Sequence, residues 1–258
     1  MNAVDIKNLC FSYGNIEVFD GLDLAIEKGL FVTILGKGAV GKSTLFKILS
    51  GSLKYNGNIS ILNKSISYNL NKGYLGLVSD DIYNFKEKKV IDELIRVLED
   101  KGKAKDKIDA EVKRIIKKVG ISDIIYSNIS DLSVKERILL MFATEILKKP
   151  RVLILDDVLN YLDNEKGKII KELIKLNKKN TTVINISNDT EECIYSKQIV
   201  ILGDTVQYFD LVSIEEDDFL NNEIDPPFMI SLSNRLKFYG LVDKNYLEME
   251  KLVDKLWQ

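Results

Sequence analysis

The chain has 258 residues, of which 45% are apolar and 29% charged, enough for the core of one large domain with a small appendage. Its 37 basic and 39 acidic side chains nearly cancel, which argues against nucleic acid as a partner. The lack of histidine excludes histidine-based acid–base catalysis and histidine metal sites, and two cysteines exclude a disulfide scaffold. No apolar run approaches the roughly 18 residues that cross a membrane, so a membrane role would need a partner.

The first 35 residues predict short strands, because their apolar side chains follow one another in short or alternating runs that Gly14 and Gly21 interrupt. A buried strand is expected over residues 31–35, and a helix is expected after the glycine-rich segment that follows it. Residues 57–78 predict further short strands.

A charged helical segment is expected in the middle of the chain, because apolar residues between 87 and 130 recur at helical spacing. The other expected elements are helices over 132–148 and near 163–178, and strands over 151–155 and 182–186. Strands that alternate with helices predict a mostly parallel sheet. The fold class is therefore α/β, with a helical subdomain of about residues 87–148 inserted into the core.

A boundary is expected near the C-terminus, where Pro226 and Pro227 follow one another. Beyond them, apolar residues again repeat at helical spacing. The sequence therefore predicts a main domain over residues 1–222 and a small helical extension over residues 223–258.

The glycine-rich segment 36–43 reads Gly-Lys-Gly-Ala-Val-Gly-Lys-Ser and fits the phosphate-binding pattern G-x-x-x-x-G-K-[ST]. Its glycines let backbone N–H groups face phosphate oxygens, and the following helix adds its N-terminal amides. Lys42 is predicted to reach the β- and γ-phosphates, and Ser43 to ligate Mg²⁺. The predicted loop residues for ATP are Gly36, Lys37, Gly38, Ala39, Val40, Gly41, Lys42, Ser43 and Thr44.

Two carboxylates follow the strand expected over residues 151–155. Such a phosphate loop needs an acidic metal partner at the end of a nearby strand, so Asp156 is predicted to hold the Mg²⁺ of a bound nucleotide. Its neighbour Asp157 is the candidate for orienting the attacking water. The structural alternatives are a capping role for Asp156 and a solvated turn position for Asp157.

The order of these motifs resembles that of the ATP-binding cassette (ABC) family of ATPases over about residues 3–210. Tyr13 resembles the aromatic residue that stacks on adenine in that family. Leu132-Ser133 resembles the start of its signature, Leu162-Asp163 its D-loop and residues 186–189 its switch segment. The structural alternatives are a strand-end tyrosine for Tyr13 and a helix N-cap for Asp163.

Within the family, the chain is most similar to the ATPase subunits of energy-coupling factor transporters, which carry a short C-terminal helical extension. This resemblance implies a P-loop NTPase core of ABC type that binds ATP and Mg²⁺. It also implies a peripheral subunit on the cytoplasmic face of the cell membrane, bound to a transmembrane transporter subunit and a second ABC ATPase subunit. The implied activity is ATP hydrolysis that drives uptake of a small molecule or ion.

At three positions of the expected nucleotide site, the chain has a different polar residue from the one in the family pattern. Asp157 stands where the family has Glu, and Asn188 where it has His; with Lys42 they are the candidate catalytic residues. Asp157 is one methylene shorter than Glu, and such a misplacement costs on the order of 10²-fold in rate. Asn188 retains an amide that donates to a γ-phosphate oxygen, or it caps a helix near residue 190. Asp80 stands where the family has Gln and either ligates Mg²⁺ or serves as a turn or N-cap residue.

The signature is altered as well, since residues 132–136 read Leu-Ser-Val-Lys-Glu without glycine. The resemblance places Ser133 and Lys135 against the ATP of the other subunit. Ser133 and Glu136 also form the S-x-x-E pattern of a capping box, which explains them structurally. Ala39 and Val40 likewise replace smaller residues of the family's loop.

Taken together, these residues predict an ATP-binding transporter subunit with slow hydrolysis. A homodimer would place the altered residues in both sites, so a heterodimer with an ordinary partner is favoured. The alternatives are a non-hydrolysing regulatory or structural ABC subunit and a soluble ABC protein without a link to transport.

Overall fold

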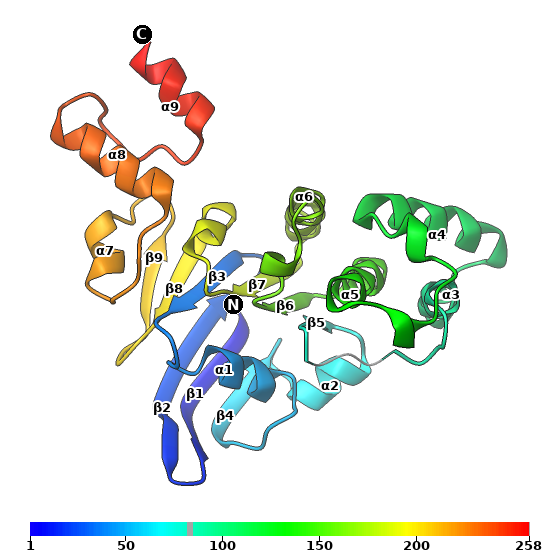
Figure 1. The fold of residues 1–258 in the computed structure, drawn as a ribbon. Coiled ribbons are helices and arrows are strands. Elements are labelled where there is room, and N and C mark those ends of the chain that lie inside the picture. The colour runs from blue at the N-terminus through cyan, green and yellow to red at the C-terminus, as the bar shows by residue number, and fades with distance from the viewer. Residues whose placement is uncertain (82–84, 258) are drawn as a thin grey trace.

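The computed structural model describes residues 1–81 and 85–257 and contains two sheets in that part of the chain (Figure 1). The larger sheet has the order β5-β6-β7-β3-β8-β9. Its strands are β3 (Phe31–Gly36), β5 (Leu75–Val78), β6 (Val152–Asp156), β7 (Thr182–Ile186), β8 (Gln198–Leu202) and β9 (Gln207–Asp210). The first five in sheet order are parallel and only β9 is antiparallel, so the carboxyl ends of β3, β6 and β7 share one edge. The predicted mostly parallel sheet is confirmed.

The smaller sheet is antiparallel and has the order β2-β1-β4. Its strands are β1 (Asn2–Tyr13), β2 (Ile16–Glu27) and β4 (Asn56–Ile61). Helix α1 (Lys42–Leu49) follows β3 directly and buries Leu45, Ile48 and Leu49, as the sequence predicted. It packs against β3, β6 and β7, so its first turn lies near the carboxyl ends of these strands.

The prediction that residues 57–78 form only strands is wrong at α2 (Ile66–Asn71). The hydroxyl of Ser65 accepts a hydrogen bond from the backbone N–H of Tyr68 and thereby caps the helix. The buried amide of Asn69 donates to the carbonyls of Ile61 and Ser65, which ties the helix to β4. These side-chain bonds stabilise a short helix that apolar spacing alone does not reveal.

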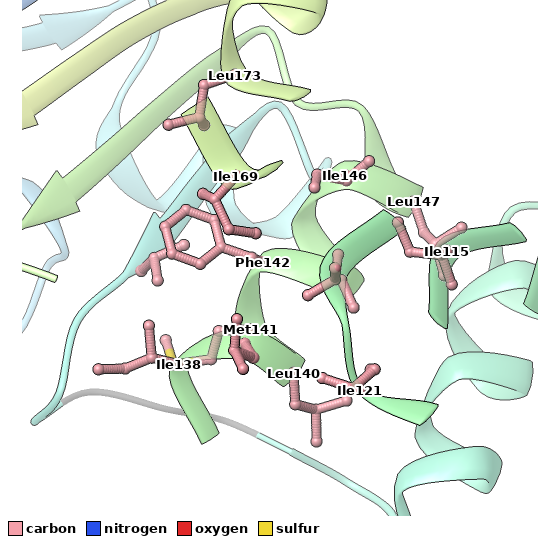
Figure 2. Close-up of a cluster of buried hydrophobic side chains, with 14 of the residues drawn as sticks. Ile115, Ile121, Ile138, Leu140, Met141, Phe142, Ile146, Leu147, Ile169 and Leu173 are labelled. Atoms are coloured by element: carbon pink, nitrogen blue, oxygen red, sulfur yellow. The ribbon is translucent and has the colours of Figure 1, made fainter. Parts of the chain in front are cut away.

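The helical subdomain contains α3 (Val90–Asp100), α4 (Lys105–Val119) and α5 (Val134–Lys148), and α6 (Lys166–Asn177) lies beside it (Figure 1). Helix α5 is buried from Ile138 to Leu147 and joins the subdomain to the core. Figure 2 shows Phe142 of α5 against Ile169 and Leu173 of α6. The short 3-10 turns are η1 (Ser122–Ile124), η2 (Ile129–Asp131), η3 (Leu159–Tyr161) and η4 (Thr190–Tyr195).

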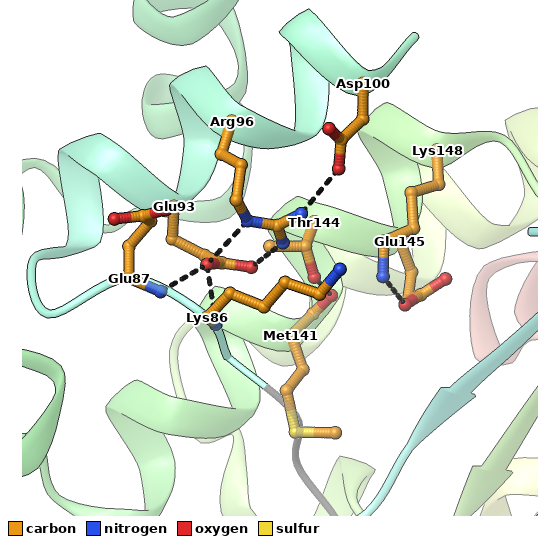
Figure 3. A network of polar contacts seen from close by, with 9 residues as sticks. All are labelled: Lys86, Glu87, Glu93, Arg96, Asp100, Met141, Thr144, Glu145 and Lys148. Carbon is orange, nitrogen blue, oxygen red and sulfur yellow. Dashed lines mark hydrogen bonds and ion pairs between the residues drawn. The ribbon is translucent and has the colours of Figure 1, made fainter.

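The backbone leading into α3 is held by a buried carboxylate. Glu93, 2% exposed, accepts hydrogen bonds from the N–H groups of Lys86 and Glu87 and pairs with Arg96 (Figure 3). Arg96 also pairs with Asp100 at 2.6 Å. Burial of a charge is tolerated only when it is paired and hydrogen-bonded, and this network meets both conditions.

The C-terminal segment contains α7 (Glu216–Leu220), α8 (Phe228–Phe238) and α9 (Met249–Leu256). Pro227 is the N-cap residue of α8, and a small cluster of Met229, Val242 and Leu252 joins α8 to α9. Helices therefore occur where the extension was predicted. Among the described residues, no helix combines the length and hydropathy of a membrane span.

Candidate functional site

The loop between β3 and α1 depends on two glycines. A Cβ atom at Gly36 would lie 2.7 Å from the carbonyl oxygen of Leu202, and one at Gly41 would lie 2.8 Å from the ring of Phe19. Gly41 also has φ of 101°, which side chains rarely adopt. At Gly38, by contrast, a Cβ would meet no described atom within 4 Å. The loop is thus tight on its protein side and open at Gly38, as a backbone cradle for phosphate requires.

The side chain of Lys42 is folded into this loop and is only 7% exposed. Its Nζ donates hydrogen bonds to the carbonyl of Gly36 and, at 3.0 Å, to that of Lys37. Burial lowers the pKa of Lys42, and the carboxylates of Asp157 and Asp156 oppose that shift. A partly desolvated ammonium beside an open backbone loop is a binding point for an anion.

The remaining residues of the predicted loop differ in exposure and backbone conformation. Lys37 points outward and pairs with Glu223 at 3.3 Å, with both side chains more than half exposed. Ala39 has φ of 64°, a left-handed conformation that disfavours a side chain. Ser43 and Thr44 lie in the first turn of α1.

Asp156 ends β6 and has the features of a metal ligand. Its Oδ1 atom is buried and lacks a hydrogen-bond partner among the described residues. Burial, and then the neighbouring charges of Asp157 and Asp80, raise its pKa to about 7. A buried carboxylate oxygen without a donor is costly unless a cation neutralises it, so this position fits Mg²⁺. Among the described residues, no group of three His, Cys, Asp or Glu side chains could hold a metal ion.

Asp157 and Asn188 meet directly at the ends of β6 and β7. Asp157 has φ of 52°, and its N–H donates to the carbonyl of Ile186. Its Oδ1 accepts from the backbone N–H of Asn188 at 3.0 Å, and its Oδ2 accepts from the Asn188 side chain at 2.8 Å. The predicted alternative that Asn188 caps a helix is wrong, because Asp189 accepts the capping bond from Glu191.

Asp80 follows β5 and is bound by a residue that the sequence did not single out. The hydroxyl of Tyr161 donates to Asp80 Oδ2 at 2.6 Å, and this bond is the main cause of a raised pKa of about 12 for Tyr161. Asp80 also contributes to the raised pKa of Asp156, so the three side chains share one neighbourhood. The only local signal was the position of Tyr161 directly before Leu162-Asp163.

The signature residues make contacts within their own chain. Ser133 caps α5, and its hydroxyl and backbone N–H both contact Glu136, so the capping box is present. Lys135 pairs with Glu165 at 2.8 Å and lies 3.9 Å from Asp163. Asp163 is 83% exposed, and Glu165 rather than Asp163 is the N-cap residue of α6. The N-cap alternative for Asp163 is therefore wrong.

Replacing Ser133 with alanine is expected to destabilise the chain by about 1 kcal/mol, because it removes the acceptor for the N–H of Glu136. Thermal unfolding without nucleotide measures this change. Ser130→Ala is the matched control, since among the described residues its exposed hydroxyl contacts Asp131 alone. An unchanged unfolding temperature for Ser133→Ala would contradict the capping role.

Tyr13 ends β1 and packs edge-to-face on Phe11, with ring centroids 4.8 Å apart. It is 47% exposed, so one side of the ring is available to a ligand. A cavity of about 980 Å³ lies between β2 and the phosphate loop and is lined by Val18, Lys37 and Ala39 among others. Tyr13 is not among the lining residues of that cavity.

The fold is that of a P-loop ATPase of the ATP-binding cassette type. The family model described as ABC transporter matches residues 19–160, and the chain belongs to this family.

Two similar proteins are ATP-binding proteins of transport systems. The spermidine/putrescine import ATP-binding protein PotA of Borreliella afzelii is 33% identical over 79% of this chain, which spans only 60% of that relative. The energy-coupling factor transporter ATP-binding protein EcfA1 of Fusobacterium nucleatum is 27% identical over 99% of this chain and 98% of that protein.

The solved structures support the fold assignment. That of cbiO1 from Clostridium perfringens, part of the ABC transporter complex cbiONQ, has a TM-score of 0.67 at 23% identity. It covers 93% of this chain and 97% of that chain. The ATP-binding cassette MJ0796 bound to ADP and Pi has a TM-score of 0.69 at 21% identity, over 82% of this chain and all of the other. The predicted ABC-type fold class is thereby confirmed.

Proposed function

We propose that this chain is the ATP-binding subunit of an ABC transporter and that it binds and slowly hydrolyses Mg-ATP. The observation that carries the proposal is the buried ammonium of Lys42, held in an open glycine loop within electrostatic range of two carboxylates. A nucleotide triphosphate would supply the negative charge for Lys42. Its accompanying cation would neutralise Asp156.

Ser43 and Asp156 would hold the Mg²⁺, with Asp80 as a further oxygen donor. When bound, the ion neutralises charge on the β- and γ-phosphates. The unpartnered Oδ1 of Asp156 supports this assignment. Tyr13 is proposed to stack on the adenine ring through its exposed side.

Slow hydrolysis is proposed because the Asp157 side chain is shorter than Glu and because Asp157 and Asn188 are already hydrogen-bonded to each other. Asp157 would orient the attacking water, and Asn188 would donate to the γ-phosphate. One N–H of the Asn188 amide donates to Asp157 Oδ2, so only its second N–H can donate to a γ-phosphate oxygen while that bond is kept. A carboxylate one methylene shorter than Glu also lies farther from the water.

We propose a heterodimer rather than a homodimer as the working unit. In such a pair, Ser133 and Lys135 would face the partner's ATP, and Asp163 would lie at the dimer interface. Lys135 is bound to Glu165 in the single chain, so dimer formation would require it to exchange that partner. A partner with an ordinary Glu and His would leave one site with intact catalytic residues.

An energy-coupling factor transporter is the proposed assembly, acting in uptake at the cytoplasmic face of the membrane. The match to EcfA1 over nearly the whole of both chains supports it, as does the helical C-terminal extension. Polyamine import is the second candidate, favoured by the higher identity to PotA.

A cavity of about 870 Å³ between the core and the helical subdomain is the proposed docking site for the membrane partner. It lies beside the network of Figure 3. Its basic lining residues are Lys72, Lys86, Arg96, Lys101, Lys148, Lys149 and Arg151, and its acidic ones are Glu93, Asp100 and Glu145. The excess of basic side chains favours an acidic segment of the partner.

The proposal is tested by titrating the purified chain with a fluorescent ATP analogue and by measuring phosphate release. We expect saturable, Mg²⁺-dependent binding and slow release, which rises when a second ABC ATPase subunit is added. Failure to bind nucleotide at millimolar concentration would contradict the function itself. Equal hydrolysis with and without the second subunit would contradict only the heterodimer.

A further inference from the structure

Asn160 lies in η3, between the Asp156-Asp157 pair that ends and follows β6 and Leu162-Asp163, and no motif assigns it a role. Its side-chain amide donates a hydrogen bond to Asp157 Oδ1 at 3.1 Å. That oxygen also accepts the backbone N–H of Asn188 at 3.0 Å. Two donors from different segments therefore hold the same oxygen.

The two carboxylate oxygens of Asp157 differ in the number of hydrogen bonds that they accept. Each carboxylate oxygen has about two lone-pair sites. Among the described residues, Oδ1 accepts two hydrogen bonds, from Asn160 and Asn188, and both of its sites are used. Oδ2 accepts one, from the Asn188 side chain, and retains one site. The free site on Oδ2 is where the carboxylate could orient a water molecule.

We propose that Asn160 is a positioning residue that fixes the carboxylate plane of Asp157 and thereby directs Oδ2 toward the attacking water. The inference rests on the proposed function, since it assumes that Asp157 orients water. Asn188 is the complementary donor, but its side-chain amide is shared, since the proposed function has it donate to phosphate as well as to Oδ2. Asn160 donates to the other oxygen and, with the backbone N–H of Asn188, can hold Asp157 in place when the Asn188 amide moves.

The contact also explains why an amide suits this position. The side chain of Asn160 is exposed and bonds to Asp157 alone among the described residues, so it adds little to the core. An amide donates to a carboxylate, whereas a carboxylate of the same size at position 160 would repel Asp157. An asparagine without a role at Asp157 would tolerate this exchange, whereas a positioning residue would not.

The test compares Asn160→Ala and Asn160→Asp with the wild-type full chain, assayed with a second ABC ATPase subunit. We expect Asn160→Ala to lower kcat about 3- to 10-fold, the effect of one exposed charge-assisted hydrogen bond, with KM unchanged. Asn160→Asp should lower kcat at least as much. Asn164→Ala is the matched control, an exposed asparagine of the same segment for which no side-chain contact is found among the described residues, and it should keep the wild-type rate.

Three results with the variants would overturn the inference. These are a wild-type kcat for Asn160→Asp, a loss of nucleotide affinity as large as the loss of kcat, or a lowered unfolding temperature that accounts for the loss. A wild-type chain that binds nucleotide without hydrolysing it would overturn it too. A wild-type chain that binds no nucleotide would instead defeat the proposed function, and the fluorescent titration separates these two cases.

Discussion

Lys42→Ala is expected to weaken ATP binding about 100-fold, because it removes the ammonium that would donate charge-assisted bonds to the β- and γ-phosphates. Such bonds contribute about 1.5–3 kcal/mol each, and a loss of about 2.7 kcal/mol corresponds to 100-fold. The ammonium is already desolvated, which lowers its pKa and makes a phosphate the natural compensating charge. A titration with a fluorescent ATP analogue measures the change.

Lys37→Ala is the matched control, since it removes the same kind of side chain from the same loop. The ammonium of Lys37 lies outside the loop against Glu223, so this change should alter affinity less than about threefold. Equal losses for the two variants would contradict the assignment of the phosphate loop. Thermal unfolding of both variants excludes a general loss of structure.

The parts of the fold that sequence alone predicted are those with a local pattern. The phosphate loop follows from eight consecutive residues, and the position of Asp156 follows from the short buried strand before it. The helices α3, α4 and α5 follow from apolar side chains at helical spacing. Helix α2 was missed because the side chains of Ser65 and Asn69, rather than an apolar stripe, stabilise it.

The interactions within the candidate site could not be predicted, because they join segments far apart in the sequence. Tyr161 reaches Asp80 across 81 residues, and Asn188 reaches Asp157 across 31. The order of the parallel strands brings these segments to one edge of the sheet. That order cannot be read from a local residue pattern. In the sequence, the residues at positions 157 and 188 are two separate departures from the family pattern. In the structure, two hydrogen bonds connect these residues to each other.

Asp156→Asn is expected to stabilise the nucleotide-free chain above pH 7 by about 1–3 kcal/mol and to abolish the Mg²⁺ dependence of ATP binding. In the unfolded chain the carboxyl group ionises near pH 3.8, and in the folded chain near 7. As the pH rises between these values, the unfolded chain releases the proton and the folded chain retains it. Stability therefore falls through this interval and is lowest above pH 7, where the charged carboxylate is buried.

Thermal unfolding from pH 4 to pH 8, with and without Mg-ATP, measures both effects of Asp156→Asn. Without nucleotide, the variant and the wild type should unfold at similar temperatures at pH 4 and diverge above pH 7, with the variant more stable. With Mg-ATP the order should reverse, because only the wild type retains the carboxylate that neutralises the ion. Asp109→Asn, which removes an exposed carboxylate from α4, should follow the wild type throughout. A variant less stable than the wild type at pH 8 without nucleotide would contradict the assignment of Asp156 as a strained, metal-binding carboxylate.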